Sequence, residues 1–159
     1  MSILSWLEAT GFGVFVRESD SLLAYPSFST VHTIGLSIIV GLSTVVAARI
    51  LGFARTMRLA PLKKLFPVMW FGFAVNLVSG SGLVTAGATT IVPNPLFIIK
   101  MISVIAAVVI LRMLQVRVFR DPDLEKKPID RTSAALAGLL LFLWLSAMIS
   151  GRMIAYGFL

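Results

Sequence analysis

Residues 27–51 read SFSTVHTIGLSIIVGLSTVVAARIL, an apolar run long enough to cross the hydrocarbon core of a bilayer as one helix. The bilayer core offers no water to backbone polar groups, so such a run is expected to be α-helical. Similar runs lie at about 65–85, 95–114 and 133–158. The sequence therefore predicts an all-α, integral membrane four-helix bundle over residues 27–159. Residues 1–26 form a separate segment before it.

The composition excludes most other classes of protein. Hydrophobic residues make up 58% of the 159 residues, charged residues only 13%, and the mean hydropathy is +0.97. These values exclude a disordered chain and almost any soluble enzyme. No Gly-rich phosphate loop, GxSxG or HExxH motif is present. The chain has no cysteine and a single histidine, His32, so thiolate sites and sites with two imidazoles are excluded.

The net charge of +7 is explained by the loops between the apolar runs. The loop at 52–64 carries four basic residues and no acid, and the loop after the third run is also rich in Lys and Arg. The loop at 86–94 has no charge. By the positive-inside rule, the two basic loops face the cytoplasm and both termini face out. No folded domain presents these charges, so no nucleic-acid partner is expected.

The N-terminal segment is predicted to lie in the outer interface of the membrane. It lacks the basic n-region of a signal peptide, and Glu8 interrupts its apolar stretch. Gly11 and Gly13 are expected to weaken or end the helix. The apolar residues that indicate a short interfacial helix are Ile3, Leu4, Trp6, Leu7 and Phe15.

Three nitrogen-bearing side chains lie inside the predicted spans at a similar depth. His32, Lys100 and Arg152 are each placed roughly 7–10 Å below the outer ends of their helices. No Asp or Glu lies within the four spans, so the two cations have no acidic partner there. They either reach outward to the surface and lipid phosphate, or face an anionic ligand inside the bundle.

Small and polar residues surround the histidine in the predicted bundle. Gly35 lies beside His32 on the first helix, and Gly72, Asn76 and Gly80 recur at four-residue spacing on the second. Gly80 matches His32 in depth. The narrow face formed by these residues leaves a gap for a flat cofactor or for a neighbouring helix. The plainer alternative is small-residue helix packing, with His32 bonded to a neighbour.

These residues predict a site for haem b or for a quinone. For haem, His32 is the candidate metal ligand, Lys100 and Arg152 hold the propionates, and the second axial ligand is a methionine, a ligand from another subunit, or none. For a quinone, the ring carbonyls bond to His32, Lys100 and Asn76. Copper is a third and weaker ligand class. The methionines available by composition are Met69, Met101, Met148 and Met153.

Five segments carry a resemblance to a known family. Through them the chain resembles a bacterial family of small four-span membrane proteins of unknown function, loosely similar to the membrane domain of copper resistance protein D (CopD). The resemblance implies a multi-pass protein of the bacterial inner (cytoplasmic) membrane, and it implies no activity. The segments are Trp6-Leu7-Glu8, Arg17-Glu18-Ser19, VHTIGL at 31–36, NPLFIIKM at 94–101 and GRMIAY at 151–156.

The leading functional hypothesis is a small membrane subunit or cytochrome b-like protein for electron transfer. It binds haem or quinone near the outer face through His32, Gly35, Asn76, Gly80, Lys100 and Arg152. The competing hypothesis is an accessory subunit that binds only lipid and other membrane subunits, or further copies of itself. A third is CopD-like copper or small-solute transport. Independent enzyme activity is not expected.

Overall fold

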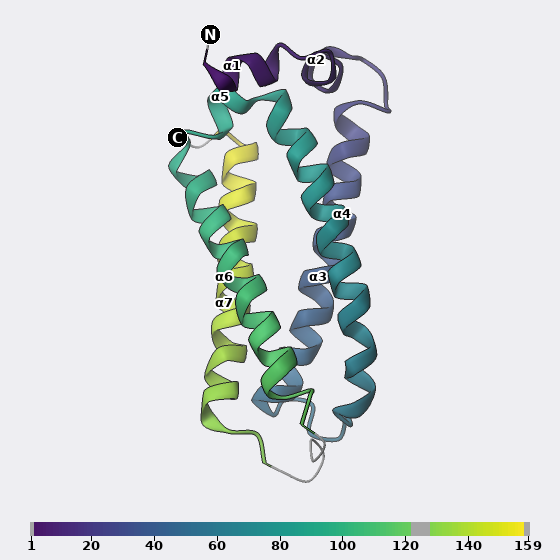
Figure 1. Ribbon diagram of the computed structural model, residues 1–159, viewed down its shortest axis with the longest axis vertical. Helices are drawn as coiled ribbons and strands as arrows, with labels where there is room; N and C mark the ends of the chain where they lie inside the picture. The colour runs from purple at the N-terminus through teal and green to yellow at the C-terminus, as the bar shows by residue number, and fades with distance from the viewer. Residues whose placement is uncertain (1, 122–127, 158–159) are drawn as a thin grey trace.

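The computed structural model describes residues 2–121 and 128–157, and every regular element within them is a helix (Figure 1). This confirms the prediction of an all-α four-helix bundle. The long helices are α3 (Tyr25–Leu51), α4 (Leu65–Ala86), α6 (Pro95–Arg117) and α7 (Arg131–Ala155). The short ones are α1 (Ile3–Glu8), α2 (Gly11–Glu18), the 3-10 turn η1 (Ala60–Lys64) and α5 (Ala88–Ile91).

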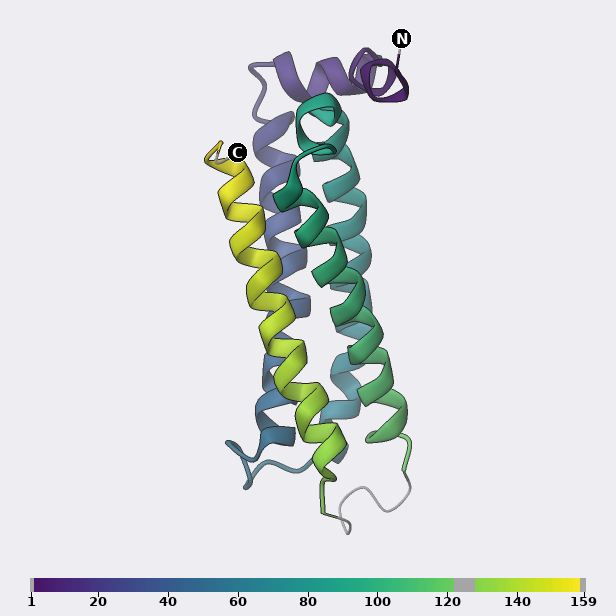
Figure 2. The ribbon, with the colours of Figure 1, turned by 90° about the vertical axis from the view of Figure 1, so that its left-hand side faces the viewer.

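The four long helices form two antiparallel hairpins. α3 packs along α4, α6 packs along α7, and the hairpins meet mainly through α3 and α7. Figures 1 and 2 show the two hairpins standing side by side, with both chain ends at the same end of the bundle. We call this end the outer end, and the end with the basic loops the inner end.

Local sequence explains where the long helices begin and end. Pro26 lies in the first turn of α3, where its missing N–H costs nothing. Gly52 then ends α3 in the left-handed conformation, with φ of 90°. Asp130 caps α7 by accepting a hydrogen bond from the Ser133 N–H. Hydrogen bonds from Ser133 and the nearby Arg117 guanidinium lower the pKa of Asp130 to about 2.

The fourth helix ends earlier than the sequence predicts. The predicted span runs to 158, whereas α7 ends at Ala155 and Gly157 follows with a φ of 72°. A glycine in this conformation just after the last turn is a common helix stop. Arg152 therefore lies in the last turn of α7. Phe158, Leu159 and part of the third loop, including Lys126 and Lys127, lie outside the described residues.

The N-terminal segment forms two short helices across the outer end of the bundle (Figure 2). The Thr10 side chain accepts from the Gly13 N–H, so α2 starts at Gly11. A Cβ at Gly13 would lie 3.1 Å from the Thr85 carbonyl oxygen, and its absence lets α2 pack on α4. Glu8 accepts hydrogen bonds from the Thr89 N–H and hydroxyl at 2.8 and 2.9 Å, which lower the pKa of its carboxyl.

The two halves of the bundle have different interiors. Small and polar residues take most buried positions of the long helices in the outer half, with Leu96 and Trp144 as the large exceptions; among them are Gly35, Ser79, Gly82, Ser103, Ala147 and Ser150. The inner half is filled by large apolar side chains, among them Val46, Phe66, Met69, Leu111, Leu114 and Leu140. The large apolar side chains that stabilise the bundle are therefore concentrated in its inner half, and the buried polar side chains lie mostly in its outer half.

Candidate functional site

His32 faces the interior of the bundle near its outer end. It is half-buried and continues the buried stripe of α3 formed by Gly35, Ile39 and Ser43. Its Nδ1 lies 3.0 Å from the backbone carbonyl oxygen of Asn76 on α4. A carbonyl can only accept, so Nδ1 carries the hydrogen and Nε2 of the neutral ring keeps its lone pair. The Asn76 side chain lies 3.5 Å from Nε2, a long contact for a hydrogen bond.

Asn76 fixes the histidine from two directions. Its backbone carbonyl accepts the ring N–H, and its side-chain Nδ2 donates to the His32 carbonyl oxygen at 2.9 Å. The hydroxyl of Ser79, one turn further along α4, lies 3.4 Å from the same Nδ1. The position and tautomer of the ring are therefore set by α4, in the way that ligating histidines are commonly oriented by a carbonyl.

The glycines on α3 and α4 serve close helix packing. A Cβ at Gly35 would lie 2.8 Å from the Asn76 nitrogen and from the Gly72 carbonyl oxygen. A Cβ at Gly80 would lie 2.9 Å from His32 Cε1, so the imidazole rests on this glycine. The Ile38 side chain occupies the space above Gly72. The gap expected along Gly72, Asn76 and Gly80 is thus filled by α3 and His32. Of the two occupants expected from the sequence, a flat cofactor or a neighbouring helix, the structure has the helix.

Lys100 lies on the interior face of α6. It shares that face with the buried residues Leu96, Ser103 and Ala107, and is itself half-buried. Its side chain lies against Gly151 of α7, and its ammonium is near enough to His32 for the two to interact electrostatically. Among the residues that the structure describes, Lys100 makes no side-chain hydrogen bond or ion pair.

Arg152 does not join the other predicted site residues. Its side chain is exposed, with the guanidinium carbon 5.9 Å from the centre of the Tyr156 ring. The interior stripe of α7 passes through Trp144, Ala147 and Gly151 at spacings of three and four. Arg152, one residue later, is turned about 100° from that stripe. The structure brings His32, Gly35, Asn76 and Gly80 together, places Lys100 within electrostatic range of His32, and leaves Arg152 at the rim.

Two residues near the site were not singled out from the sequence. Ser79 is three residues after Asn76, and Gly151 is four residues after Ala147, so helical spacing from known interior positions identifies both. Serines also line the adjoining interface, where the Ser103 hydroxyl donates to Ser146 at 3.1 Å. The outer half of the bundle interior is therefore more polar than the His32 cluster alone indicates.

The methionines proposed as second haem ligands differ in position. Met101 and Met153 are half-buried near the outer end, while Met148 is exposed. Met69 is fully buried and lies seven residues from Asn76 toward the inner end, about 10 Å along α4. Within residues 2–121 and 128–157, no group of three or more His, Cys, Asp or Glu side chains is placed to hold a metal ion.

The fold and composition define a multi-pass membrane protein. All four long helices are long and apolar enough to cross a bilayer, with a mean hydropathy of 1.4 to 2.4 over their most apolar stretches. Comparison with protein-family models, with curated proteins and with solved structures finds no match. Function is therefore inferred from the site itself.

Proposed function

We propose that this chain is a small subunit of the bacterial inner membrane that binds a quinone or haem in its outer half and serves electron transfer. The observation that supports it is the pairing of an oriented interior histidine with an unpaired interior cation on a facing helix. His32 is anchored to the Asn76 carbonyl, and Lys100 has no partner among the described side chains. Ionisable residues inside a membrane protein are costly to keep without a function.

A quinone head group is the ligand that this arrangement favours. Its reduction takes up electrons and protons at two ring oxygens. The Lys100 ammonium is a donor for a ring carbonyl, and Nε2 of the neutral His32 ring is an acceptor for a ring hydroxyl. One donor and one acceptor in mostly apolar surroundings are typical of a small-molecule site in a membrane bundle.

Haem fits the site less well. His32 offers one axial nitrogen in the tautomer that an iron ligand needs. However, the glycine-lined face that a macrocycle would use is occupied by Ile38, His32 and the backbone of α3. A visible spectrum separates the two ligands.

Ligand content of the purified protein tests the proposal. Wild-type protein, His32→Gln, Lys100→Met and the lipid-facing control Ser37→Ala are purified in mild detergent, and bound quinone is extracted and quantified. We expect near-stoichiometric quinone in wild type and Ser37→Ala, and at least fivefold less in the two site variants. A Soret band lost in His32→Gln would assign haem instead. Absence of both ligands, or equal quinone in all four proteins, would reject the proposal. Circular dichroism checks that each variant keeps its helices.

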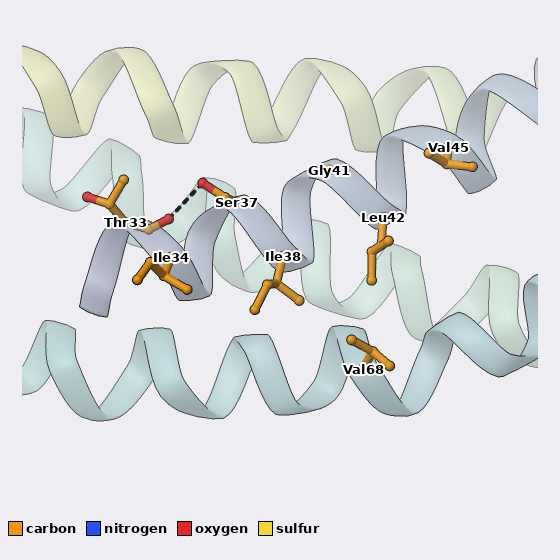
Figure 3. A pocket seen from close by; sticks show the side chains of 8 residues that line it. All are labelled: Thr33, Ile34, Ser37, Ile38, Gly41, Leu42, Val45 and Val68. Atoms are coloured by element: carbon orange, nitrogen blue, oxygen red, sulfur yellow. Dashed lines mark hydrogen bonds between the residues drawn. The ribbon is translucent and has the colours of Figure 1, made fainter. Parts of the chain in front are cut away.

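An accessory subunit is the competing function, and the outward face of α3 favours it. A shallow hollow of about 510 Å³ runs along this face and is open to the lipid side (Figure 3). Ser37 satisfies its own hydroxyl by donating to the Thr33 carbonyl at 2.8 Å, so the face requires no polar partner. The hollow is lined by Thr33, Ile34, Ser37, Ile38, Gly41, Leu42, Val45 and Val68.

A helix of another membrane subunit is the occupant that this face would take. Gly41→Leu adds side-chain volume to the hollow, and its Cβ meets no neighbouring atom of the chain, since nothing lies within 4 Å of a Cβ there. If the chain acts as an accessory subunit, this variant loses its co-purifying partner while retaining its own fold. Unchanged co-purification would reject an interface at this face.

A further inference from the structure

The Lys100 side chain of α6 contacts Gly151 of α7, the residue before Arg152. A Cβ at this glycine would lie 3.4 Å from Lys100 Nζ and 3.5 Å from Lys100 Cε, the distances of ordinary van der Waals contact. The Lys100 side chain of α6 therefore lies flat against the backbone of α7. Arg152 is the next residue of α7 and lies in its last turn. The outer end of the α6–α7 pair thus carries two positive charges around one glycine.

The described acids at the outer end do not neutralise these charges. Glu8 binds the N-terminus of α5 through Thr89, and Glu18 pairs with Arg17 at 2.8 Å. Within the described spans there is no Asp or Glu. A half-buried ammonium without a counter-charge is costly in an apolar environment. The neutralising anion must then come from outside the chain, or from the remaining outer acid Asp20 in the loop between α2 and α3.

The position of the pair matches the headgroup level of the membrane. Arg152 stacks on Tyr156, and tyrosine is enriched where a membrane protein meets the interface. Trp6, 60% exposed, lies at the same end of the bundle. A lysine stem can lie along apolar surface and carry its ammonium to that level. Phosphate oxygens are the abundant anionic acceptors there, and Lys and Arg both bind them.

The geometry points to a phosphate site at the outer end of α6 and α7, formed by Lys100 and Arg152, with an anionic phospholipid as its source. Gly151 lets the lysine lie close to α7, next to the residue that bears the second cation, so that one phosphate at the rim of the bundle would be within reach of both side chains. This site does not depend on a ligand at His32. The Lys100 ammonium carries three N–H donors, so one hydrogen bond to a phosphate would leave donors for a neighbouring ligand.

Lipid retention tests this site. Wild-type protein is reconstituted in nanodiscs of phosphatidylcholine with or without phosphatidylglycerol, then extracted in mild detergent and examined by native mass spectrometry. We expect wild type to retain phosphatidylglycerol over phosphatidylcholine, and the double variant Lys100→Met/Arg152→Gln to retain at least fivefold less. The double variant Arg55→Gln/Arg58→Gln removes the same number of charges from the exposed inner loop; it is the control and should retain as much as wild type.

Three further arms make the result decisive. Lys100→Arg keeps the charge and should retain as much phosphatidylglycerol as wild type. His32→Gln should also retain as much as wild type, which separates this site from the proposed quinone site. Inorganic phosphate in a neutral detergent, compared with chloride at equal ionic strength, shows whether a small anion suffices. A thermal shift with phosphate that the double variant loses would support the phosphate site with a free anion as its source. Equal lipid retention in wild type and the double variant, with no phosphate shift, would overturn the inference.

Discussion

Replacing Gly35 with alanine should separate α3 from α4 and release His32. The new Cβ would lie 2.8 Å from the Asn76 nitrogen and from the Gly72 carbonyl oxygen, both of which are backbone atoms that cannot rotate away. Restoring an ordinary 3.4 Å contact opens the helix pair by about 0.6 Å there. The same shift would stretch the 3.0 Å bond from His32 Nδ1 to the Asn76 carbonyl to about 3.6 Å, beyond the range of a hydrogen bond.

The cost should be measurable against a matched control on the same helix. Overpacking of this kind destabilises a protein by about 1–3 kcal/mol, and loss of a hydrogen bond adds about 0.5–1.5 kcal/mol. Gly41→Ala introduces the same methyl group where nothing lies within 4 Å, and should be neutral or stabilising by up to about 1 kcal/mol.

Unfolding in mixed micelles of mild detergent and dodecyl sulfate, followed by tryptophan fluorescence, compares the two variants. We expect Gly35→Ala to be less stable than Gly41→Ala by at least about 1 kcal/mol. It should also lose quinone in the extraction assay, because its histidine is no longer held. Equal stability of the two variants would refute the close α3–α4 packing and the anchoring of His32 that follows from it.

Three further predictions concern the ends of the bundle. Glu8→Ala should speed amide hydrogen exchange in residues 3–8 severalfold, because α1 loses its bonds to Thr89, whereas Glu18→Ala should not. The pKa of Asp130 is lowered from 3.8 to about 2, so its stabilising effect is present above pH 4 and is lost as the pH falls toward 2; Asp130→Asn should flatten the thermal stability profile across that window. Because the chain has no cysteine, a membrane-impermeant maleimide should label Ser21→Cys in intact cells and Arg58→Cys only after permeabilisation, and the reverse pattern would refute the predicted sidedness.

The four-helix architecture could be predicted because the bilayer imposes it. A run such as 27–51 has few alternatives to a helix in lipid, and the proline and glycine signals at its ends are local. Hydropathy predicts too late an end for α7, because apolar residues continue past Gly157, whereas in the structure the helix ends before that glycine, which is in the left-handed conformation. Two helices cross the outer end because Thr10 restarts the chain as a helix, a capping signal that hydropathy does not detect.

The sequence could predict the depth of the candidate site residues but not their contacts. Depth along a helix follows from residue counting, which placed His32, Gly80 and Lys100 near one level. Rotation about the helix axis decides which of them face inward, and it separates Lys100, on an interior stripe, from Arg152, about 100° away from one. The bond from His32 to a backbone carbonyl has no signal in the sequence, since every residue carries that acceptor.

The division of the interior gives the site its physical setting. Large side chains such as Phe66, Leu114 and Leu140 interlock at the inner end, where α4 and α6 are also linked by the Trp70 N–H donating to Gln115 at 3.3 Å. Toward the outer end most buried positions are glycine, alanine or serine. Small residues bring backbones together but bury little side-chain volume, so the inner half holds the helices in register and the outer half is left free to accommodate polar groups. His32 and Lys100 lie in this outer half, away from the large apolar side chains of the core that keeps the bundle folded.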